Sequence, residues 1–206
     1  MNKVHLFGYS GHAYVVIESL LNSDLPVVGY IDNSPANENP YKLNYTGSEK
    51  KDHLPQKVGT DFVFPAIGDN KVREKIDNYI QDNNLRTLTV TDSSASVSPT
   101  AIVQESTYIG KNVCVNAQAT IGRGVILNTA CVIEHECKIG DYVHIAPNTT
   151  LAGNVKVGKG SFVGAGAVIK QGVRIGESVT IGAGAVVIND IPDNETWVGN
   201  PAKRIK

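Results

Sequence analysis

The sequence has little cysteine, no charge excess and no long hydrophobic run, and each absence narrows the possible functions. Its three cysteines, Cys114, Cys131 and Cys137, are an odd number without CxxC spacing, which argues against a disulfide framework and suits a reducing compartment. The 19 basic and 20 acidic residues give a formal charge of -1, so no basic excess indicates nucleic acid or an anionic membrane as a partner. No apolar stretch approaches the roughly eighteen residues of a spanning helix, and the first residues do not read as a signal peptide. We therefore expect a cytoplasmic protein.

The second half of the chain has a six-residue repeat. Counted from residue 97, sixteen consecutive hexads begin with Val, Ile or Leu, and their fifth position is always Ala, Thr, Val, Cys, Ser or Ile. This pattern resembles the hexapeptide repeat of left-handed parallel β-helices, in which three hexads make one triangular coil. The first position would fill the axis and the fifth would pack beside it, while glycine is frequent at the second, where we expect the chain to bend. The repeat predicts a β-helix over residues 91–192.

The first ninety residues follow a different order of strand, glycine turn, helix and strand. This order predicts a βαβ unit and hence a small parallel sheet of Rossmann type over residues 1–90. The stretch 34–57 is rich in Pro, Asn and Lys, and we expect it to be a loop. The expected strands are 4–7, 26–32, 62–68 and 85–90, and the expected helices are 14–22 and 71–83.

The turn GYSGHA at residues 8–13 opens a helix directly after a strand. Backbone N–H groups at such a turn, together with the helix N-terminus, can hold a phosphate. Asp32 ends the second strand, where an acidic residue can accept hydrogen bonds from a ribose, and Gly68 follows the next strand at the same edge. Two glycines alone do not make the full dinucleotide fingerprint, so a tight turn without a ligand is the alternative. The three features together favour a nucleotide.

The segment VIEHEC at residues 132–137 places an imidazole between two carboxylates. A zinc site is disfavoured because the register turns Cys131 and Cys137 into the β-helix, whereas His135, at a third position, lies outside on a corner. A carboxylate bonded to one ring nitrogen makes the other nitrogen a better base near neutral pH. His135 is therefore a candidate general base, and an idle surface histidine is the alternative. His144 lies half a coil later and would share a cleft with it where β-helices pack around a threefold axis.

The hexads VGAGAV and IGAGAV, which begin at residues 163 and 181, lie one coil apart. Their glycines and alanines stack and leave a strip of wall almost without side chains. Such a strip suits a long thin ligand such as a pantetheine arm, because the ligand can lie flat and bond to the main chain. The alternative is that small residues simply suit these corners.

The run GVILNTACVIEHEC, the GYSGH turn and the C-terminal WVGNPAKRIK closely resemble the bacterial nucleotide-sugar acetyltransferases of the sialic acid O-acetyltransferase and UDP-4-amino-sugar N-acetyltransferase family. The resemblance covers essentially the whole chain. It implies a front domain (1–90) that binds the nucleotide-sugar, a β-helix (91–192) that binds acetyl-CoA between subunits of a homotrimer, and a tail (193–206) near the CoA. From the register, the charge balance and the lack of a long apolar run we expect no metal, nucleic acid or membrane insertion.

The resemblance also implies roles for individual residues. His135 corresponds to the general base, Glu136 to the residue that tunes its pKa, and His144 to a position near the acetyl thioester. Two alanines of the strip, Ala165 and Ala183, correspond to contacts with the CoA arm. Around the nucleotide-sugar the matching residues are Ser10, Gly11, His12, Asp32, Asn33 and Gly68, with Asn128 as a further polar contact. Relatives can carry an acid at the position of Asn33.

The expected reaction is N-acetylation of the 4-amino group of a UDP- or dTDP-linked 4-amino-4,6-dideoxy sugar, for surface glycan or glycoprotein synthesis. The amine would attack the thioester directly while His135 removes its proton, and a backbone N–H or His144 would stabilise the oxyanion. O-acetylation of a sialic acid is the alternative. A γ-carbonic-anhydrase-like protein is disfavoured because only two histidines lie in the repeat, and a dehydrogenase because the third glycine is missing.

Overall fold

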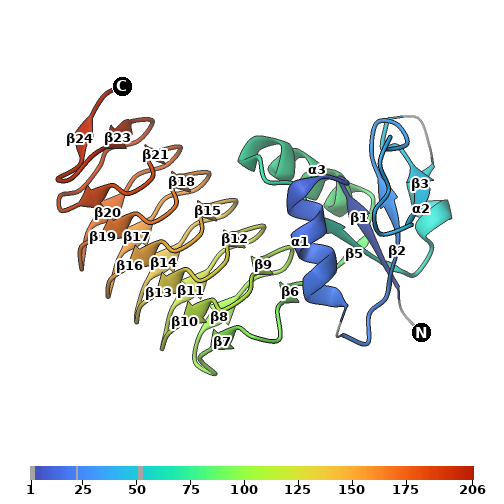
Figure 1. Cartoon of the computed structure of the whole chain (residues 1–206), viewed down its shortest axis with the longest axis horizontal. Coiled ribbons are helices and arrows are strands. Elements are labelled where there is room, and N and C mark those ends of the chain that lie inside the picture. The colour runs from blue at the N-terminus through green and yellow to red at the C-terminus, as the bar shows by residue number, and fades with distance from the viewer. Residues whose placement is uncertain (1–2, 22, 51–52) are drawn as a thin grey trace.

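The computed structural model describes residues 3–21, 23–50 and 53–206. A sheet with helices on both faces packs against one end of a long β-helix, whose other end carries the C-terminus (Figure 1). The chain therefore has the expected α/β N-terminal unit followed by a left-handed parallel β-helix of hexapeptide repeats.

The N-terminal sheet has five parallel strands in the order β3-β2-β1-β4-β5. Side chains on β1 alternate between its two faces. Leu6 packs in the same apolar cluster as Val16 of α1, whereas Phe7 packs with Ile76 of α3. The sheet is thus covered on both faces, as parallel sheets require. The strands are β1 (Val4–Phe7), β2 (Val27–Ile31), β3 (Asn44–Gly47), β4 (Phe62–Pro65) and β5 (Arg86–Thr87), and the helices are α1 (Gly11–Leu20), α2 (Leu54–Val58) and α3 (Asn70–Asp82).

The prediction of a loop over residues 34–57 is wrong in part. The segment contains β3 and most of α2. The strand reads NYTG, with no apolar alternation to indicate it, and it forms because its backbone pairs with the exposed edge of β2. The helix α1 begins at Gly11, three residues before its expected start, so Gly11 and His12 belong to its first turn.

The β-helix is built from two-residue strands that fall into three parallel sheets, one for each face of a triangular prism. Each strand pairs with the strand one coil later, so Ile126 lies beside His144 and His144 beside Phe162. One sheet contains β6 (Val90–Thr91), β9 (Tyr108–Ile109), β12 (Ile126–Leu127), β15 (His144–Ile145), β18 (Phe162–Val163) and β21 (Thr180–Ile181), then β23 (Thr196–Val198) and the antiparallel β24 (Lys203–Arg204). A second contains β7 (Ser96–Val97), β10 (Cys114–Val115), β13 (Val132–Ile133), β16 (Thr150–Leu151), β19 (Val168–Ile169) and β22 (Val186–Val187). The third contains β8 (Ile102–Val103), β11 (Thr120–Ile121), β14 (Lys138–Ile139), β17 (Lys156–Val157) and β20 (Arg174–Ile175).

First-position and fifth-position residues fill the axis of the β-helix, as the repeat predicts. Ile133 and Ile145 at first positions are fully buried, and so are Cys131 and Cys137 at fifth positions. Truncating such a first-position residue to Ala would cost about 2–5 kcal/mol. This stacked core holds the corners of successive coils in fixed register, and the corners carry the side chains of interest.

The glycine expectation needs a correction. The left-handed backbone recurs at the fourth position of the hexads, as at Asn154 (φ 56°), Gly166 (φ 67°) and Gly184 (φ 67°), so the bend lies there. Second-position glycines have a different cause. A methyl group built on Gly164 would lie 2.6 Å from the backbone N of Ala183 in the next coil, so the close stacking of coils excludes a side chain.

A buried polar junction joins α3 to the β-helix. The Arg73 side chain is buried and its Nε donates to the Gly124 carbonyl at 2.6 Å. One turn later Asp77, also buried, accepts from Arg123 Nε at 2.6 Å and from the Tyr142 hydroxyl at 2.8 Å. Because each of these groups is paired, the junction fixes the orientation of the sheet on the β-helix.

Candidate active site

The carboxyl edge of the N-terminal sheet forms a cavity of about 230 Å³. Gly8 and Ser10, which precede α1, line it on one side, and Asp32 and Asn33, which follow β2, line it on another. The Ser10 side chain makes no capping hydrogen bond to α1, so its hydroxyl is available to a ligand. Gly8 has φ of 90°, and a methyl group there would lie 3.2 Å from the Ala66 carbonyl oxygen. The turn therefore requires glycine and leaves helix N–H groups directed at the cavity.

The two residues after β2 are held in different ways. Asp32 accepts from the Asn33 N–H through Oδ1 at 2.7 Å, which leaves its other carboxylate oxygen available for ribose hydroxyls. Asn33 accepts from Lys50 Nζ through Oδ1 at 2.7 Å, so its amide nitrogen remains as a donor. This pairing gives Asn33 a fixed place at the cavity.

Gly68 and His12 lie apart from this cavity, at the junction with the β-helix. The His12 ring meets Tyr108 edge-on at 5.4 Å and lies 6.5 Å from the ring of His144. Burial lowers the pKa of His12 to about 3, with further lowering from His144 and Arg73. Its Nε2 is buried and has no hydrogen-bond partner among the described residues. Such an unpaired buried nitrogen is uncommon, because most buried polar groups have a hydrogen-bond partner.

His144 has a defined tautomer. Its Nδ1 lies 3.4 Å from the carbonyl oxygen of Gly68, which can only accept, so Nδ1 carries the proton. Its Nε2 lies 3.2 Å from Asn128 Nδ2, and the Asn128 oxygen already accepts from the Thr129 N–H at 2.8 Å, so Asn128 donates to Nε2. Burial, and then the positive charge of Arg73, lower the pKa of His144 to about 4. His144 is therefore neutral at pH 7, and the lone pair of its Nε2 accepts the hydrogen bond from Asn128.

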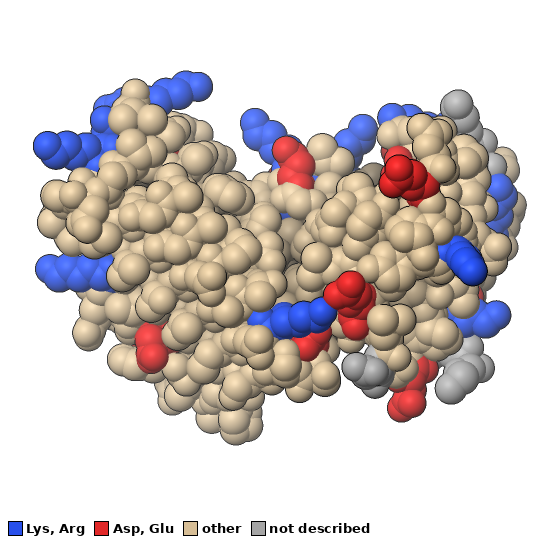
Figure 2. All heavy atoms as spheres, viewed as in Figure 1, with Lys and Arg blue, Asp and Glu red and all other residues tan. Residues whose placement is uncertain are grey.

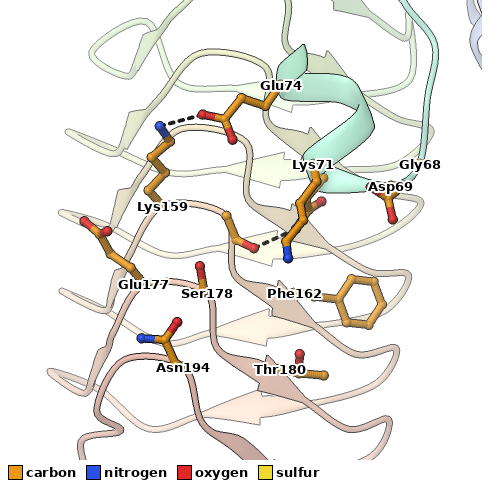
Figure 3. Close-up of a pocket in the computed structure, with 12 residues that line it drawn as sticks. Gly68, Asp69, Lys71, Glu74, Lys159, Phe162, Glu177, Ser178, Thr180 and Asn194 are labelled. Atoms are coloured by element: carbon orange, nitrogen blue, oxygen red, sulfur yellow. Dashed lines mark hydrogen bonds and ion pairs between the residues drawn. The ribbon is translucent and has the colours of Figure 1, made fainter. Parts of the chain in front are cut away.

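A cleft of about 820 Å³ continues from Gly68 along the β-helix. Its floor is the outward row of one sheet, on which Phe162 and Thr180 follow His144 in register. Figure 3 shows Phe162 and Thr180 on the β-helix and Lys71 extending toward them from the N-terminal end of α3. An ion pair between Lys159 and Glu74, 2.6 Å long, crosses the cleft between its two walls. Lys71 lines the cleft and brings a positive charge to it.

His135 lies outside on a corner, as the register predicts. Its Nδ1 lies 3.0 Å from Oε2 of Glu136. Because a carboxylate accepts, Nδ1 carries the proton and Nε2 keeps a free lone pair. The side chains are 51% and 61% exposed, so solvent and substrates can reach the pair. The far edge of the ring rests on Gly153, one coil later, which it covers.

The corner of His135 is the one opposite to the N-terminal sheet. His135 lies between β13 and β14, which belong to the second and third sheets. The N-terminal unit contacts the other two corners, through Glu18 with Lys111 (2.6 Å) and through Arg73 with Gly124. Within one chain, therefore, the nucleotide edge and His135 lie on different sides of the β-helix.

The glycine strip lies beyond these residues toward the C-terminus. Ala165 and Ala183 are exposed at third positions of successive coils, and Gly184 donates its N–H to the Ala165 carbonyl at 2.8 Å. The C-terminal tail borders the strip, because a methyl group on Gly182 would lie 2.7 Å from the Val198 side chain. Figure 2 shows Lys and Arg side chains gathered at this end of the molecule, where the exposed strand β24 begins at Lys203.

Two other properties bear on the chemistry. Burial raises the pKa of the Cys131 thiol to about 12, so this cysteine is no nucleophile. The described residues contain no group of three or more His, Cys, Asp or Glu side chains that could hold a metal ion. Likewise, no helix described is long and apolar enough to cross a membrane.

Three residues of the site escape prediction from the sequence. Arg73 has the pattern of an exposed helical residue, because an arginine among polar neighbours gives no sign of burial. Phe162 follows from the register only once the face of the β-helix that meets the N-terminal sheet is known. Gly153 had a usable signal, since no other third position of the sixteen hexads is glycine.

Comparisons with known proteins agree along the whole chain. The PglD N-terminal domain family matches residues 3–80, and the bacterial transferase hexapeptide (six repeats) family matches residues 118–153 and 154–189. The structure of PerB from Caulobacter crescentus in complex with CoA and GDP-perosamine is 35% identical with a TM-score of 0.94, over 100% of this chain and 98% of that one. The acetyltransferase domain of PglB from Neisseria gonorrhoeae is 29% identical with a TM-score of 0.90, over 100% of both chains. The GDP-perosamine N-acetyltransferase of Escherichia coli is 33% identical over 92 residues, which span 45% of this chain and 42% of that enzyme.

Proposed function

Because the chain belongs to the bacterial nucleotide-sugar N-acetyltransferases of the hexapeptide-repeat superfamily, we propose that it transfers an acetyl group from acetyl-CoA to the amino group of a nucleotide-linked amino sugar. The single observation that carries the proposal is the His135–Glu136 pair. Nδ1 shares its proton with Glu136, so Nε2 has the free lone pair that a general base requires, and the side chain is half exposed on a β-helix corner.

The nucleotide-sugar binds at the carboxyl edge of the N-terminal sheet. Its diphosphate meets the helix N-terminus at Ser10 and Gly11, and its ribose meets Asp32, with Asn33 beside it. The sugar then enters the larger cleft past Gly68, and we assign His12, which lies directly behind Gly68, to the same part of the site. One amide N–H of Asn128 donates to His144 and its Oδ1 accepts from Thr129, so its second amide N–H remains for the sugar.

In the reaction, the amine nitrogen attacks the thioester carbonyl carbon while Nε2 of His135 accepts a proton from that nitrogen. The tetrahedral intermediate collapses to the amide with loss of the CoA thiolate, which takes the proton back from His135. The Glu136 carboxylate stabilises the imidazolium in between. The acetyl group passes directly from CoA to the amine, so no acyl-enzyme is needed, in keeping with the burial of Cys131 and Cys137.

The oxyanion of the intermediate needs a hydrogen-bond donor. His144 is unsuited as it stands, because its Nε2 accepts from Asn128 and its Nδ1 proton is directed at Gly68. A backbone N–H at the corner of His135 is the better donor, since main-chain dipoles need no change of protonation. The neutral ring of His144 then serves as a contact surface near the thioester, beside Phe162 at 5.1 Å.

Acetyl-CoA lies along the glycine strip, with its pantetheine arm on Ala165 and Ala183 and its phosphates toward the basic tail, residues 193–206. We assign nucleotide-sugar binding to residues 1–90 and acetyl transfer to residues 91–192. No metal takes part. Assembly as a homotrimer stays a prediction, which is supported by the position of His135 opposite to its own nucleotide edge, since a neighbouring subunit's edge would complete the site. A cytoplasmic location stays a prediction.

The sequence predicts UDP or dTDP as the nucleotide, whereas PerB was solved with GDP-perosamine, also an amino sugar. GDP-perosamine is therefore the first acceptor to test, followed by UDP- and dTDP-linked 4-amino sugars. The experiment is CoA release in the presence of each acceptor, with sialic acid included for the alternative of O-acetylation. Products of amine and hydroxyl acceptors are separated by their stability to mild base. Sialic acid as the one productive acceptor would replace the proposal by its alternative.

A further inference from the structure

Gly153 lies at a position of the repeat where the backbone does not require glycine. Third positions of the other fifteen hexads hold a range of side chains, including Pro, Arg, Thr, Lys and Glu. The left-handed backbone that favours glycine lies at the fourth positions, and Gly153 is not among the residues with positive φ. The lack of a side chain at residue 153 therefore needs another cause.

That cause is the imidazole of His135. A methyl group built on Gly153 would lie 2.6 Å from both Cε1 and Nε2 of the ring and 3.3 Å from Cδ2. Ordinary contacts between such atoms begin near about 3.5 Å, so the ring occupies the place where a Cβ would be. The edge concerned includes Nε2, the nitrogen left free by the bond from Nδ1 to Glu136.

The corner cannot widen to admit a side chain. The Asn154 N–H donates to the His135 carbonyl at 2.8 Å, and the Gly172 N–H donates to the Gly153 carbonyl at 3.0 Å. These bonds tie residue 153 to the coil before it and the coil after it. The neighbouring Leu151 is fully buried in the axis and holds the same coil from inside. A side chain at residue 153 would consequently displace the ring, which is half exposed and free to turn outward.

We propose that Gly153 is a positioning residue, which seats the His135 imidazole so that Nδ1 stays on Glu136 and Nε2 stays over the backbone of residue 153. The proposal rests on the proposed function, in which His135 is the general base. Glu136 and Gly153 hold opposite edges of one ring, the first by a hydrogen bond and the second by having no Cβ.

The test is Gly153→Ala, with Gln171→Ala as the matched control. Gln171 is the third-position residue one coil further on, and its side chain is exposed. In Gly153→Ala we expect kcat to fall about a hundredfold, because a shift of about 1 Å at a catalytic group has effects of this size. The KM values for acetyl-CoA and the nucleotide-sugar should stay within about threefold, since Gly153 is assigned no contact with either. Gln171→Ala should match the wild type in both. A kcat of Gly153→Ala within threefold of the wild type would overturn the proposal.

A second readout separates seating of the ring from other effects of the methyl group. Imidazole ¹⁵N spectra should show the Nδ1-protonated tautomer of His135 in the wild type and its loss in Gly153→Ala. An unchanged His135 signal together with a low kcat would also overturn the proposal. Glu136→Ala gives the reference spectrum for a ring without an acceptor at Nδ1.

Should Gly153→Ala fold poorly, the double variant His135→Ala/Gly153→Ala tests whether the new methyl group clashes with the ring. Removing the ring makes room for the new methyl group, so its urea midpoint should return to that of His135→Ala. A double variant as unstable as Gly153→Ala would contradict the contact. Neither spectra nor midpoints depend on turnover, so they test the seat even if His135→Ala retains wild-type activity and the proposed function fails.

Discussion

Replacing Arg73 by lysine tests whether the polar junction fixes the substrate cleft. The guanidinium donates to five carbonyl oxygens, of Gly124 (2.6 Å), Ile67 (3.0 Å), Gly68 (3.1 Å), Tyr142 (3.0 Å) and Val143 (3.5 Å), and it also bonds to the side-chain oxygen of Asn70 at 2.9 Å. A lysine ammonium at the end of a different stem can reach two of these acceptors at most. At least three buried acceptors would then lose their donor, at about 1 kcal/mol each. We expect Arg73→Lys to lower the free energy of unfolding by about 3–5 kcal/mol.

The same change should affect substrate binding, because Arg73 holds the Gly68 carbonyl that orients His144. We expect the KM for the nucleotide-sugar to rise about tenfold. Urea unfolding and steady-state kinetics give the two quantities. Arg86→Lys is the matched control, since Arg86 is exposed and donates to one carbonyl, of Thr60, and it should cost under about 1 kcal/mol. An Arg73→Lys protein within 1 kcal/mol of the wild type, with unchanged KM, would refute the reasoning.

Three further predictions concern other parts of the site. Glu136→Gln should lower kcat by at most about fivefold, because the pair is exposed and the Gln oxygen still accepts from Nδ1; a loss of a hundredfold or more in steady-state kinetics would contradict this. Ala183→Trp should raise the KM for acetyl-CoA by tenfold or more, because the ring would fill the strip; an unchanged KM would remove the strip from the CoA site. His12 and His144 have folded-state pKa values, about 3 and about 4, below the unfolded value of 6.5, so the unfolded chain binds more protons between these limits. The stability that the neutral rings contribute is complete above about pH 6.5 and is lost as the pH falls toward 4. For His144 the loss is about 3 kcal/mol. The urea midpoint should therefore fall over this range, and the NMR signals of the two rings should not titrate between pH 5.5 and 9.

The repeat made the β-helix predictable because each hexad position has one environment. A branched residue at every first position specifies the axis, so the sidedness of Cys131, Ile133 and His135 followed from counting alone. The N-terminal sheet was predictable for a similar reason, since its central strands are short apolar runs. The edge strand β3 was not, because its sequence NYTG acquires strand geometry from the pairing of its backbone with β2.

The site was predictable where chemistry depends on local sequence and unpredictable where it depends on packing. His135 and Glu136 are adjacent in sequence, and the bond between them needs only the corner geometry. The burial of Arg73 depends on how α3 docks on the β-helix, which the pattern of α3 does not encode. The separation of His12 and Gly68 from the Ser10 cavity likewise depends on that docking.

The central claim is that the free Nε2 of His135 takes the proton of the attacking amine. The most direct measurement is the rate of acetyl-CoA consumption with saturating nucleotide-linked amino sugar, for the wild type and for His135→Ala, with the unfolding midpoint of each. We expect acetyl transfer by the wild type and a kcat lower by about 10²–10⁴ in the folded His135→Ala variant, with KM values little changed. A folded His135→Ala protein that turns over at nearly the wild-type rate would contradict it.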